Sequence, residues 1–188
     1  MKYVFDPEVL RGIAQAHLDL PLEQMMTTIT EDLAARYPGR IETGSREWVF
    51  NNAGGVMGQF TILYASLSEY LIFFGSPMGS VGHTGRYHFV EDYAFILDGE
   101  FWHYNQGDTE RQEFGKGEVV RLPKGEAHCY CMADRGWILE YARGPIMTML
   151  PFGFADTVLS TLDYRTFFRT LRLYGRHVLR SFRSPPGQ

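Results

Sequence analysis

The chain has 188 residues, which is enough for one domain with a single substantial hydrophobic core. Hydrophobic residues make up 45% of it and aromatic residues 15%, while charged residues make up only 21%, so wholesale disorder is excluded. No run of about 18–20 uninterrupted apolar residues occurs, and the sequence therefore predicts no transmembrane helix. The N-terminus reaches Asp6-Pro7-Glu8 within a few residues and does not resemble a secretory signal.

The formal net charge of −4 is unevenly distributed along the chain. From Asp163 to the last residue the chain carries six arginines and one acid, a net charge of +5, and the rest carries −9. A basic tail on an acidic body favours contact with an anionic lipid surface or with nucleic acid. No other feature of the sequence indicates nucleic acid, so we expect no nucleic-acid partner.

Two helices are predicted near the N-terminus, within residues 1–40. Asp6-Pro7-Glu8 combines an N-cap residue, a proline in the first helical position and an early acid, so a helix should begin there and run to about His17. A second helix should start at Leu20-Pro21 and end at Tyr37-Pro38-Gly39.

From Glu47 onward the sequence is rich in β-forming residues and in glycine turns. Residues 59–74 are apolar and long enough for two strands or one bent strand. The turn signal Asp98-Gly99 predicts a hairpin over 93–104. Further strands are predicted over 119–122, 127–132 and 137–141, separated by Lys124-Gly125 and Arg135-Gly136. Many short strands with glycine turns indicate a barrel or a sandwich.

The helical period returns after Pro151. A short helix is predicted over 154–161, and Asp163 should cap a longer helix that runs to about Phe182. In the longer helix the arginines recur three or four residues apart on one face, and apolar residues lie opposite. Such a helix is suited to a bilayer interface, although a helix packed on the barrel with a solvated arginine face would show the same pattern.

Two stretches of the sequence are similar to the paired motifs of cupin barrels. The second motif is nearly complete, and its residues are Gly117, Pro123, Gly125 and His128. The first is partial and consists of His88, Asp92 and Gly99, with Arg86 where a metal-binding cupin has its first histidine. His88, Asp92 and His128 could together hold zinc or ferrous iron. Because this ligand set is incomplete, we expect no cofactor and keep a metal site as the alternative.

A longer series of ordered segments carries a more specific resemblance. The segments are Asn52-Ala-Gly-Gly55, Ala65-Ser-Leu-Ser-Glu-Tyr70, Gly82-His-Thr-Gly-Arg86, Glu140-Tyr-Ala-Arg-Gly144, Met149-Leu-Pro-Phe-Gly-Phe154 and Ser160-Thr-Leu-Asp163. Together they closely resemble the fungal sterol C8 isomerases and the animal sigma-1 receptor, over about residues 48–180. Glu91-Asp92-Tyr93 and Leu150-Pro-Phe-Gly-Phe154 are more similar to the isomerases.

The resemblance implies a fold that is mainly β with flanking helices. We expect residues 1–188 to form one domain, with a cupin-like β-barrel over 47–146 and two amphipathic, membrane-facing helices over 151–183. It also implies a homotrimer. Members of the family usually carry an N-terminal transmembrane anchor, and none is predicted here, so attachment should rest on the C-terminal helices. We therefore expect a peripheral or monotopic membrane protein, at the endoplasmic reticulum in a eukaryote or the cytoplasmic membrane face in a bacterium.

The reaction that the resemblance implies moves a sterol double bond from C8(9) to C8(7). It needs one proton delivered to C9 and another removed from C7, with a tertiary carbocation at C8 between the two steps. Water would trap that cation, so the reaction needs a dry apolar cavity. One carboxylic acid in it must be protonated while a carboxylate lies nearby, which burial and a shared site can achieve.

Four acids are considered for this pair. Glu140 lies in an otherwise apolar predicted strand, which is costly for an acid unless it is paired or protonated. The resemblance places here the acid that binds cationic amine ligands of the sigma-1 receptor. The second acid should be Glu91 or Asp92, which are adjacent and so point to opposite faces of a strand, and we prefer Asp92 slightly. Glu69 is a third matched acid, for which we expect a structural role, paired with Arg86 or Arg143.

Several further side chains are candidates for substrate binding. Aromatic faces can stabilise a cation, and hydroxyl or imidazole groups can position the acids through hydrogen bonds. These candidates are Tyr70, His83, Tyr87, Tyr141, Phe95 and Trp137. The sequence therefore predicts a sterol Δ8–Δ7 isomerase whose ligand is a sterol or another hydrophobic or cationic amphiphile. A non-catalytic receptor for hydrophobic amines or sterols is the alternative, because a pocket that binds a cation mimic serves both.

Overall fold

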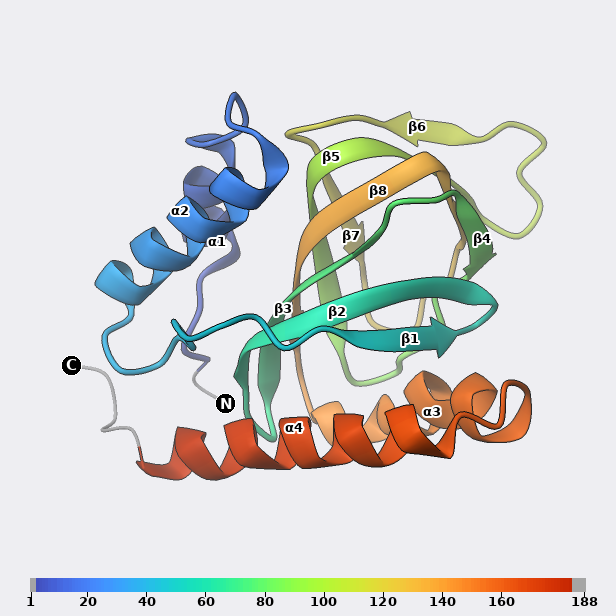
Figure 1. The fold of residues 1–188 in the computed structure, drawn as a ribbon. Coiled ribbons are helices and arrows are strands. Elements are labelled where there is room, and N and C mark those ends of the chain that lie inside the picture. Colours follow the sequence, from blue (N-terminus) through green and yellow to red (C-terminus); the bar gives the residue numbers. More distant parts are fainter. Residues whose placement is uncertain (1–2, 184–188) are drawn as a thin grey trace.

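The computed structural model describes residues 3–183, and Figure 1 shows their arrangement. Eight antiparallel strands form one curled sheet in the order β1-β2-β3-β8-β5-β6, with β4 paired to β8 and β7 paired to β5. Two helices lie against one side of the sheet, and two more cross beneath it. The strands are β1 Val49–Ala53, β2 Val56–Ala65, β3 Glu69–Ser76, β4 Ser80–His83, β5 Glu91–Tyr104, β6 Gln112–Phe114, β7 Val119–Leu122 and β8 Cys129–Arg143. The helices are α1 Pro7–Gln15, α2 Leu22–Arg36, the short 3-10 turn Ile146–Thr148, α3 Leu150–Leu159 and α4 Tyr164–Arg183.

This architecture confirms the expected fold class, mainly β with flanking helices. The N-terminal helices begin as predicted, since the Asp6 carboxylate accepts a hydrogen bond from the Glu8 backbone N–H and caps α1. Residues 59–74 fall in two strands, β2 and β3, rather than one. None of the helices between residues 3 and 183 combines the length and the apolar character needed to cross a bilayer.

The predicted hairpin at Asp98-Gly99 is wrong, and so is the predicted break at Arg135-Gly136. Both glycines lie inside long strands, β5 and β8, and face each other across the ladder. Gly99 has a φ of 84°, and a Cβ placed on it would lie 2.2 Å from the carbonyl oxygen of Arg135. The pairing shifts on both sides of Asp98, so this glycine pair marks a bulged bend at which the two strands curve together. A turn residue here bends the barrel wall instead of reversing the chain.

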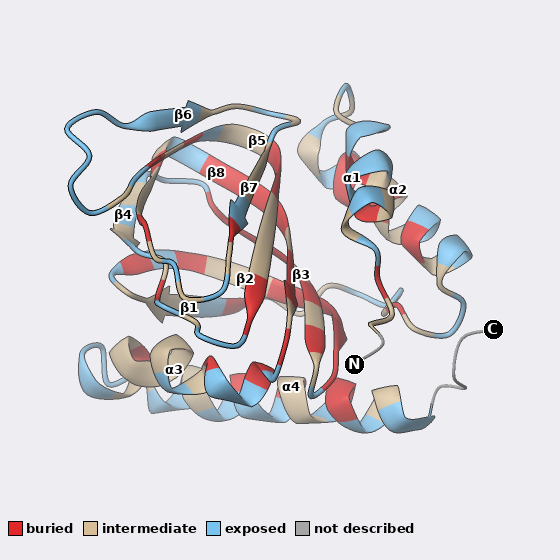
Figure 2. Cartoon of the chain, turned by 180° about the vertical axis from the view of Figure 1, so that it is seen from behind, coloured by how far each residue is buried: buried red, intermediate tan, exposed pale blue. Residues whose placement is uncertain are grey.

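The N-terminal helices cover the outer face of the sheet. The main hydrophobic core joins Met26, Ile29 and Leu33 of α2 with Leu139 and Tyr141 of β8. Figure 2 shows buried residues on the sides of α1 and α2 that face the strands and exposed residues on their outer sides. Because side chains alternate along a strand, the odd-numbered residues 137–141 of β8 pack under these helices. The even-numbered residues of the same stretch face the inside of the barrel.

The C-terminal helices close the end of the barrel near β1 and β2, as Figure 1 shows. Asp163 caps α4 as predicted, because its carboxylate accepts a hydrogen bond of 3.0 Å from the Thr166 N–H. Asp156 of α3 accepts a hydrogen bond of 2.9 Å from the Gly55 N–H in the β1–β2 turn. The arginine face of α4 partly meets acids of the segment between α2 and β1, with Arg169 and Arg176 on Glu47 and Arg180 on Glu42.

Glu69 fixes the N-terminal segment to the barrel. It is 1% exposed, and its carboxylate accepts hydrogen bonds from the backbone N–H groups of Val4 at 2.7 Å and Phe5 at 3.4 Å. The Tyr141 hydroxyl donates to the same carboxylate at 3.0 Å. The structural role expected for Glu69 therefore holds, but its partners are backbone amides and Tyr141 rather than Arg86 or Arg143.

The stability of the fold should depend on this contact. Replacing Glu69 with Gln turns one carboxylate oxygen, an acceptor, into an NH2 group, which cannot accept from the N–H donors around it. We expect the free energy of unfolding to fall by about 1–3 kcal/mol. Urea unfolding followed by circular dichroism measures the difference. Glu113→Gln is the matched control, since Glu113 pairs only with the exposed Arg111 and should change little. Equal losses in the two variants would contradict the anchoring role.

Candidate active site

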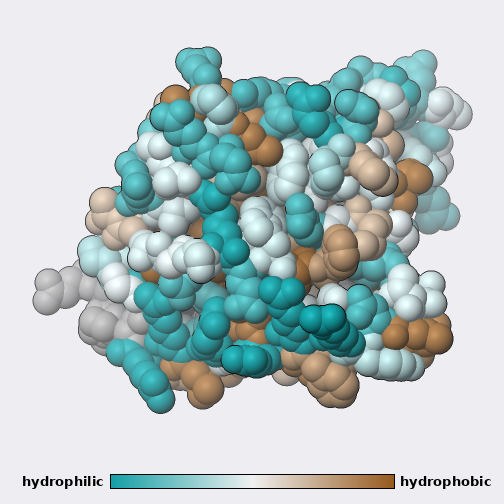
Figure 3. Space-filling model, viewed as in Figure 1, coloured by the Kyte–Doolittle hydropathy of each residue, from teal (hydrophilic) through white to brown (hydrophobic). Residues whose placement is uncertain are grey.

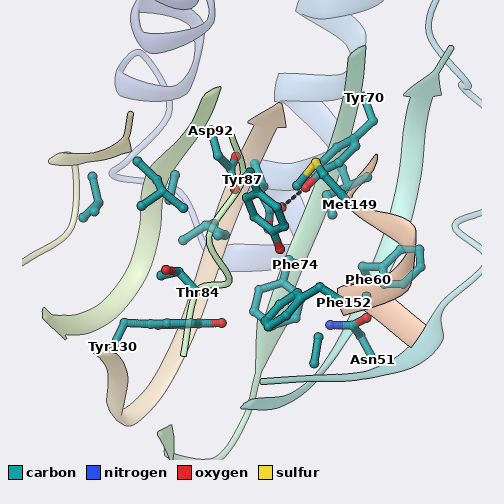
Figure 4. Close-up of a pocket in the computed structure, with 18 of the residues that line it drawn as sticks. Asn51, Phe60, Tyr70, Phe74, Thr84, Tyr87, Asp92, Tyr130, Met149 and Phe152 are labelled. Atoms are coloured by element: carbon teal, nitrogen blue, oxygen red, sulfur yellow. Dashed lines mark hydrogen bonds between the residues drawn. The ribbon is translucent and has the colours of Figure 1, made fainter. Parts of the chain in front are cut away.

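The inside of the barrel holds a cavity of about 240 Å³, bounded by the strands and by α3 and α4. Close packing normally leaves few voids larger than a water molecule, so a space of this size is a feature of the fold. Its walls are largely apolar, with side chains that include Phe60, Ile62, Ile72, Phe74 and Phe152. Figure 4 shows Phe60, Phe74 and Phe152 grouped on one side of it with Asn51 beside them, and Asp92 farther away.

Strand register places two acids side by side on the inner face. Asp92 of β5 and Tyr70 of β3 both pair with Ala142 of β8, while Glu140 lies two residues earlier on β8. Residues two apart on a strand share a face, so Glu140 is the diagonal neighbour of both Asp92 and Tyr70. The intervening inner-face residues, Ala142 and Ala94, are small and leave the carboxyl groups room. The acid pair preferred from the sequence is thus brought together.

Glu140 has one polar partner in the cavity. The Tyr70 hydroxyl donates a hydrogen bond to its Oε1, drawn as the dashed line in Figure 4. Burial raises the pKa of the Glu140 carboxyl above its usual range, and the hydrogen bond from Tyr70 acts in the opposite direction. Tyr70 therefore favours the ionised form of this acid.

Asp92 is less well satisfied than Glu140. Its Oδ1 is buried and has no hydrogen-bond partner among residues 3–183. Burial raises the pKa of Asp92 well above its usual range, and the negative charge of Glu140 raises it further. Two carboxyl groups in one apolar space repel each other strongly when both are ionised, so this geometry favours a pair that shares one proton. Asp92, with one oxygen left without a partner, is the better site for a shared proton.

Two further phenols surround the acids. Burial, with the charges of Asp92 and Glu140, raises the pKa of the Tyr87 and Tyr130 hydroxyls far above the usual value. Both phenols therefore stay protonated and can donate hydrogen bonds inside the cavity. Figure 4 shows that Tyr70, Tyr87 and Tyr130 reach the cavity from separate elements.

Glu91, the other candidate for the second acid, lies outside the cavity. Its carboxylate accepts two hydrogen bonds from Arg143, at 2.9 and 2.7 Å, and others from Arg121. Burial acts to raise the pKa of Glu91, but the hydrogen bonds from Arg143 and Arg121 outweigh it and lower the pKa. Glu91 therefore forms a structural ion pair on the outer face of the barrel. It points outward because side chains alternate along a strand and the next residue, Asp92, points inward.

Three of the aromatic residues expected to bind substrate are also on the outer face. Phe95, Trp137 and Tyr141 belong to the core under the N-terminal helices and do not line the cavity. The rings of Trp137 and Trp48 pack edge to face at 5.6 Å. By contrast, Tyr70, Tyr87 and His83 line the cavity as predicted. His83 accepts a hydrogen bond of 2.9 Å from the Gly85 N–H, which fixes its ring at the cavity wall.

The three residues considered as metal ligands are not brought together. Asp92 and His128 line the cavity, whereas His88 is exposed and lies outside it. Residues 3–183 contain no group of three or more His, Cys, Asp or Glu side chains with the geometry to hold a metal ion. The donors present in the cavity therefore do not fit the metal site of a cupin.

Sequence analysis missed several residues of the cavity, notably Tyr130, His103, Met149 and Phe152. Tyr130 could have been found, because it lies an even number of residues from Glu140 on the same strand. The predicted break at Arg135-Gly136 hid that relation. Met149 lies between the 3-10 turn and α3, and Phe152 lies in α3. The packing of this segment across the barrel end depends on contacts distant in sequence.

Solved structures with a related shape give only weak matches. A cupin superfamily protein from Desulfitobacterium hafniense matches 66% of this chain and 88% of its own, with 17% identity and a TM-score of 0.41. A predicted oxalate decarboxylase from Thermotoga maritima matches 53% of this chain and 92% of its own, with 20% identity and a TM-score of 0.43.

Sequence comparison is far more specific. A C-8 sterol isomerase from Pyricularia oryzae is 50% identical over 181 residues, covering 94% of this chain and 81% of its own. A C-8 sterol isomerase from Aspergillus fumigatus is 41% identical over 180 residues, covering 94% and 75%. The sigma non-opioid intracellular receptor 1 of Xenopus tropicalis is 38% identical over 178 residues, covering 94% and 80%. The family model described as "ERG2 and Sigma1 receptor like protein" matches residues 1–184, and this chain belongs to that family.

Proposed function

We propose that this protein is a sterol Δ8–Δ7 isomerase that moves a ring double bond by adding and removing protons inside the barrel. The observation that carries the proposal is the Asp92–Glu140 pair, two carboxyl groups side by side in an apolar cavity with one unpartnered oxygen. The names of the fungal relatives, C-8 sterol isomerases at 41% and 50% identity, support it independently.

The geometry favours one assignment of roles. Asp92 holds the proton and delivers it to C9, and the π electrons of the C8–C9 bond form the new C9–H bond. The tertiary cation left at C8 then loses a proton from C7 to the Glu140 carboxylate, and the electrons of that C–H bond become the C7–C8 double bond. Tyr70 supports this direction, since its hydrogen bond stabilises ionised Glu140. Return of the proton from Glu140 to Asp92 restores the starting state.

The cavity walls protect the intermediate. Tyr87, Phe74 and Phe152 present aromatic surface around the acids, and aromatic faces attract a nearby cation. Glu140 becomes neutral only after the cation has gone, so the charge at C8 has a carboxylate beside it throughout. A water molecule in the same place would end the reaction as an alcohol. The apolar lining is therefore as necessary as the acids.

Heavy water tests this mechanism directly. The wild-type protein supplied with a Δ8 sterol in deuterated buffer should yield a Δ7 product with deuterium at C9, detected by mass spectrometry and NMR. Asp92→Asn and Glu140→Gln should each lower the rate at least about 100-fold, because each removes one of the two proton-transfer groups. Glu91→Gln is the matched control, since Glu91 lies outside the cavity, and it should retain most of the activity.

Loss of turnover in Glu91→Gln with retention in Asp92→Asn would reverse the assignment.

A second function is consistent with the same site, because a protonated amine resembles the C8 cation and would bind the same carboxylates. The 38% identity to a sigma receptor makes it the natural alternative. Binding of a cationic amphiphile without any conversion of a Δ8 sterol would favour that receptor function.

We also propose that the C-terminal helices rest on a membrane surface. Large apolar side chains of α3, α4 and the turn between them are exposed, among them Leu159, Leu162, Phe168, Leu179 and Phe182. Leu162 keeps an apolar side chain although its φ of 53° favours glycine or asparagine. Figure 3 shows apolar side chains projecting from the lower edge of the molecule, where Figure 1 places α4, below a band of polar ones. This arrangement suits the interface between headgroups and acyl chains.

Vesicle binding tests the membrane contact. Phe168→Ser combined with Phe182→Ser should lower the partition coefficient onto anionic phospholipid vesicles at least tenfold, because burying each large apolar side chain contributes about 1.5–3 kcal/mol. Met78→Ser combined with Phe89→Ser removes equally exposed apolar side chains outside these helices and should bind as the wild type does. Equal losses in both pairs would contradict the assignment. The homotrimer implied by the family and the location at a cellular membrane remain predictions.

A further inference from the structure

The cavity has a second polar region, formed by two histidines. Glu140 lies near the end of β8 and Asp92 near the start of β5, whereas His103 lies near the end of β5 and His128 just before the start of β8. Both imidazoles line the cavity, and they are only 9% and 6% exposed. Their rings stack in parallel, with centroids 4.5 Å apart and 7° between the planes. The mechanism proposed above uses neither of them.

The position of His128 is fixed from several sides. Its backbone N–H donates to the Thr84 hydroxyl at 2.9 Å, and its carbonyl accepts from the Thr84 N–H at 3.0 Å. One face of its ring is covered by His103, which itself packs against Phe114 at a centroid distance of 4.8 Å. A side chain held in this way presents its ring nitrogens in defined directions.

A chain of hydrogen bonds determines the tautomer of His128. Asp108 accepts a hydrogen bond of 3.0 Å from Asn105 Nδ2, which settles the orientation of the Asn105 amide. The oxygen of that amide therefore faces His128 Nδ1 at 2.7 Å. Because an amide oxygen can only accept, His128 must carry its proton on Nδ1. Nε2 of the neutral ring is then left as an acceptor.

That acceptor is buried without a partner. His128 Nε2 makes no hydrogen bond within residues 3–183, although leaving a buried polar atom of this kind unsatisfied is destabilising. Burial, with the neighbouring His103, lowers the pKa of His128, so the ring stays neutral and keeps its lone pair. An acceptor fixed at the wall of an apolar cavity selects a ligand with a matching donor.

We infer that His128 Nε2 accepts a hydrogen bond from the hydroxyl group of the ligand. The inference rests on the proposed function and deepens it. A sterol carries its 3-hydroxyl on ring A, next to ring B, where the double bond moves. A sterol whose ring B meets Asp92 and Glu140 would be held at a second point by His128, which would set which carbon faces which acid. His103 is a positioning residue that holds the His128 ring in place.

Binding measurements test this without any requirement for turnover. The dissociation constants of a Δ8 sterol and of its 3-deoxy counterpart should differ about tenfold for the wild-type protein in detergent micelles, with the hydroxylated ligand tighter. His128→Leu should remove that difference by weakening only the hydroxylated ligand. His128→Gln keeps an acceptor near the Nε2 position and should retain part of the preference. His88→Gln, an exposed histidine outside the cavity, is the control.

Equal affinity of the wild type for the two ligands would overturn the inference, whatever the variants do. A hydroxyl preference that survives in folded His128→Leu would also overturn it. The preference and the isomerase activity can fail separately: a protein that discriminates the hydroxyl but converts no sterol would refute the proposed reaction alone. One that isomerises both ligands with equal affinity would refute only the role of His128.

Discussion

The proposed reaction depends on two carboxyl groups that share one apolar space. Asp92 and Glu140 lie on the inner face of neighbouring strands, and the surrounding walls prevent both from ionising together. In that reaction the aromatic lining and the helices that close the barrel end keep water from the pair, and the small alanines between the acids leave the carboxyl groups room. In the proposed mechanism, a proton moves between these two fixed positions.

The buried acids of this chain show how structural and chemical roles diverge. Glu69 receives two backbone N–H groups and a tyrosine hydroxyl, and Glu91 receives two arginines. Both are satisfied and both stabilise the fold. Glu140 accepts a hydrogen bond from Tyr70, whereas Oδ1 of Asp92 has no partner within residues 3–183. An acid left short of partners in a cavity costs stability, and that cost is typical of a site kept for reactivity.

Much of the fold could be predicted from local patterns, because caps, prolines and apolar periodicity act over a few residues. The start of each N-terminal helix and the Asp163 cap illustrate this. The alternation of side chains along β8 would have predicted more of the site. If Glu140 faces inward, Trp137 and Tyr141, at odd separations from it, must face outward. Long-range partners could not be predicted, since nothing local to Gly99 shows that it meets Gly136 in a bend, or that Glu69 meets the N-terminal backbone.

The protonation state of the acid pair is the most direct test of the central claim. Infrared difference spectroscopy at neutral pH should show the carbonyl stretch of one buried protonated carboxylic acid, which disappears in Asp92→Asn and persists in Glu91→Gln. Because burial and the charge of Glu140 raise the pKa of Asp92 well above its usual range, the band should persist at pH values where an ordinary aspartate is ionised and disappear at higher pH. A spectrum without a protonated carboxyl group at neutral pH, or a band unaffected by Asp92→Asn, would contradict a shared proton held by Asp92.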